Sequence, residues 1–188
     1  MRFYVADEHI DHTNVLEHMP GRGELFTDLV QMRGEFTQRH NSVVKPQDEV
    51  YHLGDVAFNW KNHLEYISKL NGNHFLIKGN HERSRDVKQL LKAGKPYGWI
   101  KDVYMVKKPQ LIWLSHYPHL SWPQSHYGAI HLHGHSHGNL RWRFGKMLDV
   151  GLDNHDFYPW SEEEILDHMA SVEFIPTDHD RRRNDEQL

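Results

Sequence analysis

The sequence predicts an α/β fold, because short apolar runs that suit β-strands alternate with segments of helical periodicity. The first half of the chain shows a β-α-β-α-β order, and the second half is richer in strands. The chain has 188 residues, which suits one domain with a substantial core. We therefore expect a single domain over residues 1–176 and a polar tail over residues 177–188.

Seven short apolar runs are expected to form the strands. Their lengths of four to six residues and their bounding polar or glycine-containing stretches are typical of strands in globular proteins. The runs are Arg2–Ala6, Glu49–Gly54, Phe75–Lys78, Val103–Lys107, Leu111–Ser115, Ala129–His133 and Met147–Val150.

Three segments show the patterns of amphipathic helices. Residues 25–36 repeat apolar side chains with a period close to that of a helix. Asn59 can cap a second helix, which Gly72 would help to end. Ser161 and Glu164 form a capping-box pattern at the start of a third helix.

The composition argues against several classes of protein. A net charge of −4 supplies no broad basic surface for nucleic acid or an anionic membrane. The absence of cysteine excludes disulfide scaffolds, thiol catalysis and thiolate zinc sites. No apolar run reaches the ~18 residues of a transmembrane helix, and no signal-peptide pattern follows Met1. We expect a cytoplasmic protein without a membrane partner.

Five polar stretches stand at the ends of apolar runs or just after them. In open α/β sheets, ligands bind outside the carboxyl ends of the strands, so side chains at these ends can converge. Several of the side chains are histidines, of which the chain has 18, and imidazole is a common metal ligand. The stretches are Asp7-Glu8-His9, Gly54-Asp55, Gly79-Asn80-His81-Glu82, Ser115-His116 and Gly134-His135-Ser136-His137.

Each stretch also has an ordinary structural explanation when it is taken alone. Gly54-Asp55 is a common turn dipeptide, and a lone His116 is typical of a partly buried histidine with a hydrogen bond. Histidines alternate with other residues over positions 131–137, but Gly134 interrupts the period, so only some of them need share a target. The order of all five stretches, each after an expected strand, favours one common site.

In this order, the stretches resemble the motifs of the calcineurin-like metallophosphoesterase superfamily over about residues 3–155. Residues 50–55 and 149–153 are also similar to stretches in its small prokaryotic and phage-type phosphoesterases. The resemblance implies a four-layer α/β/β/α sandwich with two mixed sheets and a metal site at the carboxyl ends of the strands. The residues after Asp55 lack the Val-Asp-Arg-Gly extension of the protein Ser/Thr phosphatases, which argues against a phosphoprotein phosphatase.

The resemblance also implies two divalent metal ions that share the carboxylate of Asp55. Such sharing reduces the repulsion between two cations ~3.5–4 Å apart. Oxygen and imidazole ligands suit Mn²⁺, our first expectation, and also iron or zinc. One ion would be held by Asp7, His9, Asp55 and His137, and the other by Asp55, Asn80, His116 and His135.

The implied reaction is hydrolysis of a phosphoester by attack of a metal-bound hydroxide. His81 would stabilise the transition state and protonate the departing oxygen. We expect a small or nucleotide-like phosphodiester as the substrate, with a phosphomonoester of a small metabolite as the alternative. A histidine-rich metal-binding protein without turnover and a degenerate binding scaffold are the non-enzymatic alternatives. The full ligand set together with His81 disfavours both.

Three further residues are candidates for contact with substrate. His12 closely follows the first motif, and the guanidinium groups of Arg22 and Arg83 suit phosphate oxygens, although both also fit surface charges. The aromatic segment over residues 113–127 could stack a nucleobase beside the site or cover the edge of a sheet. Glu8 is interpreted as a variable position. The histidines expected at the surface are His63, His74, His126, His168 and His179.

Overall fold

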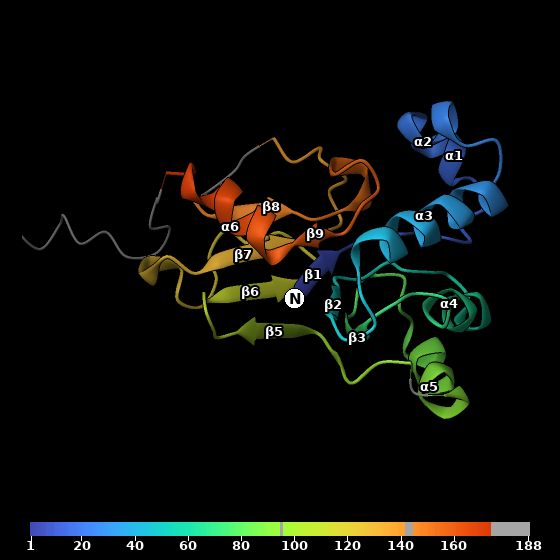
Figure 1. Ribbon diagram of the computed structural model, residues 1–188, viewed down its shortest axis with the longest axis horizontal. Helices are drawn as coiled ribbons and strands as arrows, with labels where there is room; N and C mark the ends of the chain where they lie inside the picture. The colour runs from blue at the N-terminus through green and yellow to red at the C-terminus, as the bar shows by residue number, and fades with distance from the viewer. Residues whose placement is uncertain (95, 142–144, 174–188) are drawn as a thin grey trace, which may run out of the picture.

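The computed structural model describes residues 1–94, 96–141 and 145–173 (Figure 1). These residues form an α/β fold with two mixed β-sheets and six α-helices, which confirms the predicted fold class. Within them, no helix combines the length and the apolar character needed to cross a membrane. The tail predicted for residues 177–188 lies outside the described residues, and the single domain over residues 1–176 stays a prediction.

The first sheet contains five strands. They are β1 (Arg2–Val5), β2 (Glu49–His52), β3 (Asn73–Ile77), β4 (Ile100–Lys101) and β9 (Trp160–Ser161). Their order is β4-β3-β2-β1-β9, with β1 to β4 parallel and β9 antiparallel to β1. The carboxyl ends of β1, β2 and β3 therefore share one edge of the sheet.

The second sheet contains four strands in the order β5-β6-β7-β8. They are β5 (Val103–Val106), β6 (Ile112–Ser115), β7 (Ile130–His133) and β8 (Met147–Asp149). Strands β6, β7 and β8 are parallel, and β5 is antiparallel to β6. A parallel bridge between Ala6 and Gly151 joins the two sheets. This bridge brings the carboxyl ends of both sets of parallel strands to one region.

The seven predicted strands are confirmed, each within two residues at either end. Strands β4 and β9 were not predicted. Each has two residues, which is too short to show the alternating pattern by which strands are found in a sequence.

The helices are α1 (Val15–His18), α2 (Pro20–Leu25), α3 (Leu29–Val43), α4 (Trp60–Ile67), α5 (Ser84–Ala93) and α6 (Glu162–Ala170). The caps of α4 and α6 are confirmed, since Asn59 accepts from the Lys61 amide and the Ser161 capping box is complete. The helix predicted over residues 25–36 begins later, at Leu29. The Asp28 side chain accepts two amide hydrogen bonds there and fixes the start of α3.

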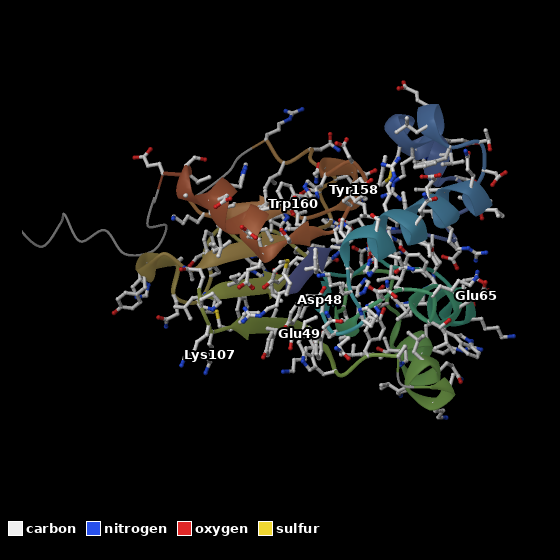
Figure 2. All side chains as sticks on the ribbon, viewed as in Figure 1. Asp48, Glu49, Glu65, Lys107, Tyr158 and Trp160 are labelled. Carbon is white, nitrogen blue, oxygen red and sulfur yellow. The ribbon has the colours of Figure 1, made fainter. Side chains whose placement is uncertain are left out.

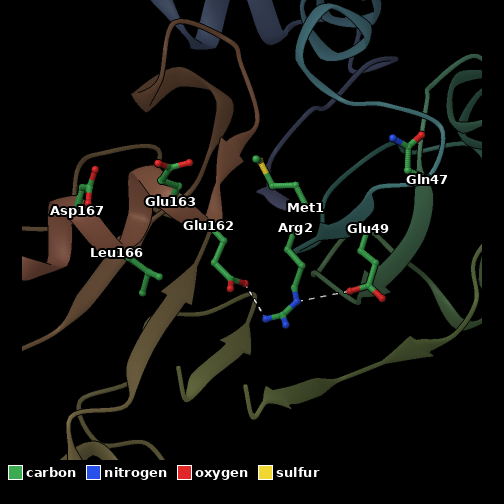
Figure 3. Close-up of a pocket in the computed structure, with 8 residues that line it drawn as sticks. All are labelled: Met1, Arg2, Gln47, Glu49, Glu162, Glu163, Leu166 and Asp167. Atoms are coloured by element: carbon green, nitrogen blue, oxygen red, sulfur yellow. Dashed lines mark hydrogen bonds and ion pairs between the residues drawn. The ribbon is translucent and has the colours of Figure 1, made fainter. Parts of the chain in front are cut away.

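At its amino-terminal edge, the first sheet carries a wide hollow. Asp48 and Glu49 lie side by side at the start of β2 (Figure 2). Together with the starts of β1 and α6, Glu49 lines a hollow of about 590 Å³ (Figure 3). Arg2 reaches across this hollow and pairs with Glu162 at 2.7 Å. The hollow lies at the end of the sheet away from the predicted metal ligands.

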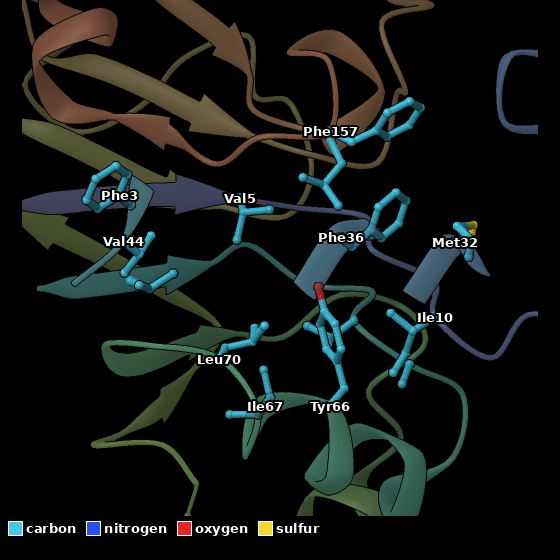
Figure 4. Packing of buried hydrophobic residues seen from close by; sticks show 14 of the residues in the cluster. Phe3, Val5, Ile10, Met32, Phe36, Val44, Tyr66, Ile67, Leu70 and Phe157 are labelled. Atoms are coloured by element: carbon cyan, nitrogen blue, oxygen red, sulfur yellow. The ribbon is translucent and has the colours of Figure 1, made fainter. Parts of the chain in front are cut away.

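Alternate residues of β1 face two hydrophobic clusters. Phe3 and Val5 pack in one cluster with Phe36 of α3 and other helical side chains (Figure 4). Tyr4 lies in the other cluster, together with second-sheet residues such as Leu132. Helices therefore cover one face of the first sheet and the second sheet covers the other. The four-layer sandwich goes beyond these contacts and stays a prediction.

Candidate metal centre

The predicted ligands all stand just beyond the carboxyl end of a parallel strand. The bridge between Ala6 and Gly151 brings the strand ends of the two sheets together, so side chains from both sheets can meet. The ligands follow β1 (Asp7, His9), β2 (Asp55), β3 (Asn80), β6 (His116) and β7 (His135, His137).

Six of the seven predicted ligands and His81 fall into three groups that could hold a metal ion. Within each group, one nitrogen or carboxylate oxygen of every residue lies within 4.8 Å of the others. The groups share residues, so they form one continuous cluster. They are Asp7 with His9 and His137, Asp55 with His116 and His135, and His9 with Asp55 and His81.

Asp7 has one paired and one unpaired carboxylate oxygen. Its side chain is fully buried. Its Oδ2 accepts a hydrogen bond from the His135 amide at 2.8 Å. Its Oδ1 is buried without a hydrogen-bond partner among the described residues, and it lies 4.0 Å from Nε2 of His9. A buried carboxylate oxygen without a partner is costly, and a cation beside it would remove that cost.

His116 turns a ring nitrogen toward two oxygens. Its Nδ1 lies 2.8 Å from the Leu53 carbonyl and must donate, because a carbonyl oxygen only accepts. Its Nε2 then faces Asp55 Oδ2 at 3.4 Å and Asn80 Oδ1 at 3.0 Å. Burial lowers the pKa of His116, but the hydrogen bond and charge of Asp55 raise it by more. A proton or a metal ion is needed between these acceptors.

Glu82 holds the two loops that carry Asp55 and Asn80. Its buried carboxylate accepts hydrogen bonds from the amides of Asp55 at 2.8 Å and Gly79 at 2.7 Å. Burial raises the pKa of Glu82 to about 7. A β-carbon at Gly79 would lie 2.2 Å from Asp55 Oδ1, so only glycine allows this approach. The sequence assigns no role to Glu82, because no local signal shows that it reaches back to Asp55.

Backbone strain is concentrated in the cluster. Non-glycine residues rarely adopt a positive φ, which costs about 1–3 kcal/mol each and persists where the surroundings enforce it. Such strain is typical of functional sites. Predicted ligands account for five of the eight described non-glycine residues with positive φ. They are Asp7, His9, Asp55, His135 and His137, with φ from 46° to 67°.

Arg22 lies behind the cluster, and its hydrogen-bond partners are other groups of the protein. It is fully buried. Its guanidinium donates to the carboxylate of Asp153 and to the backbone carbonyls of Asp7 and Glu8. The interpretation of Arg22 as a surface charge is wrong, and these contacts turn its donors away from a substrate. Arg83 is exposed at the start of α5, and its backbone amide donates to the His81 carbonyl at 2.9 Å.

A hollow of about 200 Å³ lies over the cluster. His12 and His81 line it together with predicted ligands. The His81 ring lies 4.0 Å from the ring of Phe58, and its Nε2 lies 3.6 Å from Asp55 Oδ2. The His81 side chain is 31% exposed. His81 can therefore reach a molecule in the hollow while Phe58 restrains its ring.

Two residues of the aromatic segment lie in different surroundings. Tyr117 is exposed beside the cluster, where its ring lies 4.5 Å from that of His135. Its hydroxyl donates to Asn80 Oδ1 at 3.3 Å. Trp122 is instead buried and donates to the Ala129 carbonyl at 2.8 Å. Tyr117 therefore lies beside the cluster, as its position directly after the predicted ligand His116 indicates, and stacking on a nucleobase stays a prediction.

Glu8, interpreted as a variable position, is buried and has a defined partner. Its Oε1 lies 2.6 Å from Nδ1 of His52, and Nε2 of His52 lies 3.0 Å from Nδ1 of His74. Burial raises the pKa of Glu8 to about 8. The Glu8 side chain points away from Asp7 and His9, and its contact with His52 holds the loop after β1 against β2.

His63 and His74 are buried, so the prediction that they lie at the surface is wrong. His63 Nε2 lies 2.5 Å from the Tyr97 hydroxyl. Periodicity could have found both, because His63 lies four residues before the buried Ile67 of α4 and His74 alternates with the buried Leu76 of β3. His168 is exposed as predicted and His126 is half-buried. His179 lies outside the described residues.

Comparison with known proteins supports the fold more than the chemistry. No protein-family model matches the chain. Over 187 residues it is 29% identical to an uncharacterized protein from Methanocaldococcus jannaschii. The matched region covers 95% of this chain and 96% of that protein.

Two solved structures are similar to this one. A protein of unknown function from Aquifex aeolicus matches 89% of this chain and 98% of its own, with a TM-score of 0.68 and 23% identity. It therefore shares the α/β fold. A structure described as a novel archaeal phosphodiesterase matches 80% of this chain and 81% of its own, with a TM-score of 0.46 and 19% identity. A TM-score below 0.5 does not establish a common fold.

The fold and the site together define an α/β protein with a cluster of histidine and aspartate side chains that could hold metal ions.

Proposed function

We propose that the protein is a metal-dependent phosphoesterase of the calcineurin-like superfamily, with the four-layer sandwich of that superfamily. The convergence of hydrogen-bond acceptors at the carboxyl ends of the strands carries the proposal. Asp7 Oδ1 is buried without a partner among the described residues, and His116 Nε2 faces oxygens of Asp55 and Asn80. Acceptors converge in this way where a cation binds.

The donor set fits two divalent ions that share the Asp55 carboxylate. The Asp55 side chain belongs to two of the three groups, one with His9 after β1 and one with His116 after β6. Carboxylate, amide and imidazole ligands suit Mn²⁺ first, with iron or zinc as alternatives. Asp7, His9, Asp55 and His137 would hold one ion, and Asp55, Asn80, His116 and His135 the other.

His81 is the residue best placed to act on a leaving group. The ions, when bound, would activate water and neutralise charge on the phosphoryl oxygens. The imidazole of His81 lines the hollow over the cluster and would donate a proton to the departing oxygen. Packing against Phe58 at 4.0 Å restrains the ring. His12 lines the same hollow and would contact the substrate.

A second hollow beside the first favours a phosphodiester over a phosphomonoester. It has a volume of about 350 Å³ and shares His18, Met19 and His137 with the hollow over the cluster. Leu25 and Phe157 add apolar surface, and none of the described residues that line it is Lys or Arg. A diester could place its second substituent there, whereas a monoester has none. That substituent would be uncharged, as in a small or nucleotide-like diester.

Hydrolysis of bis(p-nitrophenyl) phosphate by the Mn²⁺-loaded protein tests the proposal. We expect turnover that EDTA abolishes, with a lower kcat/KM for p-nitrophenyl phosphate. A preference for the monoester would favour a phosphomonoesterase. Metal binding without turnover of either ester in Mn²⁺, Zn²⁺, Fe²⁺ or Ni²⁺ would contradict the proposal and favour a metal-binding protein.

A further inference from the structure

A single buried guanidinium connects three segments behind the candidate metal centre. Arg22 of α2 has no solvent exposure. Its Nε and Nη2 each donate to one oxygen of Asp153, both at 2.7 Å. Its Nη2 also donates to the Asp7 carbonyl at 2.6 Å, and its Nη1 donates to the Glu8 carbonyl at 2.8 Å. These four hydrogen bonds join α2 to the loop after β1 and to the segment after β8.

Through Asp153, Arg22 reaches the ring of His137. Oδ2 of Asp153 lies 3.0 Å from Nδ1 of His137. A carboxylate in this position keeps the proton on Nδ1 and leaves Nε2 free to bind a metal ion. The two hydrogen bonds from Arg22 fix the Asp153 carboxylate beside the imidazole, so Arg22 acts on His137 through Asp153.

Through the two carbonyls, Arg22 also holds the loop that carries Asp7 and His9. Both residues have positive φ, 60° and 48°, a conformation that needs support from its surroundings. The bonds from Arg22 hold the carbonyls of Asp7 and Glu8 toward α2. The ring of Phe36 lies 5.3 Å from the guanidinium carbon, so the group is fixed by packing as well as by hydrogen bonds.

We propose that Arg22 is a positioning residue that orients Asp7, His9 and His137 for metal binding. The inference rests on the metal centre of the proposed function, but it concerns metal affinity and not turnover. Lysine could not replace Arg22, because one ammonium group cannot pair with both oxygens of Asp153 and also reach two carbonyls. An arginine that bound a phosphate group would instead affect KM.

The test compares Arg22→Lys with Arg33→Lys, using Mn²⁺ titration calorimetry on metal-free protein. Arg33 lies on α3, partly exposed, 3.8 Å from Glu65. We expect Arg22→Lys to bind Mn²⁺ about 10- to 100-fold more weakly and Arg33→Lys to match the unmodified protein. Asp153→Asn should weaken binding as well. The double variant should lose less than the sum of the two single losses, because Arg22 acts partly through Asp153.

A measurement on the unmodified protein covers the case in which Arg22→Lys does not fold. In metal-free protein labelled with ¹⁵N at histidine, NMR should show the neutral His137 ring with its proton on Nδ1. A proton on Nε2 would overturn the inference. So would unchanged Mn²⁺ affinity in a folded Arg22→Lys variant, or the absence of Mn²⁺ binding in the unmodified protein. Mn²⁺ binding without turnover would contradict the phosphoesterase alone.

Discussion

The two ends of the first β-sheet both carry acidic side chains, but the partners of these side chains differ. At the amino-terminal end, Asp48, Glu49 and Glu162 have cationic partners. Glu162 pairs with Arg2 at 2.7 Å, and Asp48 pairs with the N-terminal amine at 2.6 Å. At the carboxyl end, Asp7 Oδ1 has no partner among the described residues, and Asp55 Oδ2 faces imidazole nitrogens.

The larger of the two hollows does not lie at the predicted ligands. The amino-terminal hollow measures about 590 Å³ and the hollow over the histidines about 200 Å³. Paired charges at a partly exposed surface contribute little to stability and need no ligand as a further partner. Buried acceptors without partners, held on strained backbone, would gain a partner from a bound cation. These unpartnered acceptors favour the smaller hollow as the candidate site.

The largest difference between the two ends should follow from removing one carboxylate at each. Asp55→Ala removes the side chain shared by two of the three ligand groups, so we expect loss of bound metal and of phosphodiester hydrolysis to the level seen with EDTA. Glu162→Gln at the other end should keep both. Elemental analysis and a bis(p-nitrophenyl) phosphate assay measure the outcome. Metal retained in Asp55→Ala would contradict the assigned role of the carboxylate.

His81→Ala should separate catalysis from metal binding. We expect activity to fall about 10²- to 10⁴-fold, the usual contribution of a general acid, while the metal content stays unchanged. His168→Ala is the matched control, because His168 is exposed on α6. Kinetics and elemental analysis on the same preparations measure both effects. If His81→Ala loses metal, His81 is a ligand and not the acid.

Gly134→Ala should disturb the candidate metal centre at the carboxyl ends of the strands through packing alone. A β-carbon there would lie 2.6 Å from Asp7 Oδ2, so we expect unfolding free energy to fall by about 1–3 kcal/mol and Mn²⁺ to bind more weakly. Gly34→Ala in α3 meets nothing within 4 Å and should stabilise the protein by about 0.5–1 kcal/mol. Urea unfolding and calorimetry measure both. Normal Mn²⁺ affinity in Gly134→Ala would show that the ligand loop tolerates displacement.

Two buried histidines outside the ligand cluster, His63 and His74, should make the protein less stable in acid. Burial lowers the pKa of His63 and of His74 to about 3. In the unfolded chain, both rings take up protons as the pH falls below about 6.5. Their contribution to the free energy of unfolding is therefore complete above that pH and is lost toward pH 3. The slope approaches about 1.4 kcal/mol per pH unit for each ring. Glu8, with its pKa raised to about 8, has the opposite effect and partly offsets this loss.

His63→Gln tests this explanation, because glutamine can keep a hydrogen bond to Tyr97 and does not titrate. Urea unfolding at pH 7 and pH 5.5 should show a smaller acid-induced loss of stability in this variant than in the unmodified protein. An equal loss in both proteins would mean that His63 already carries a proton in the folded state.

The smallest effect should come from the ion pairs of the amino-terminal hollow. Glu49 is 44% exposed and lies 3.6 Å from Arg2. Glu49→Gln should therefore change unfolding free energy by less than about 1 kcal/mol, with no change in Mn²⁺ affinity. Chemical unfolding and calorimetry measure these quantities. A large loss of affinity would assign a ligand site to this end of the sheet.

The positions of the ligands could be predicted because each follows a strand whose apolar pattern is local. The residues that hold the ligands could not. Arg22 meets Asp153 across 131 positions in the sequence, and Glu82 reaches back 27 positions to the Asp55 amide. No periodicity or motif spacing links such pairs. Arg22 also looks like an exposed charge in the sequence, and only the packing around Phe36 makes its burial evident.

The fold shows the same division between local and long-range information. Strands of three or more residues and the caps at Asn59 and Ser161 follow from local patterns. Helix α5 was not predicted, although its buried Leu90 faces the protein, because only this one side chain of the helix is buried. The joining of the two sheets at Ala6 and Gly151 depends on backbone pairing between distant segments.

Anomalous scattering from crystals grown with Mn²⁺ tests most directly whether the carboxyl ends of the strands form the metal centre. We predict two manganese peaks per chain, one on each side of the Asp55 carboxylate, with Asp7, His9 and His137 around one and Asn80, His116 and His135 around the other. The absence of peaks at these side chains, or peaks only in the hollow lined by Arg2 and Glu162, would contradict it.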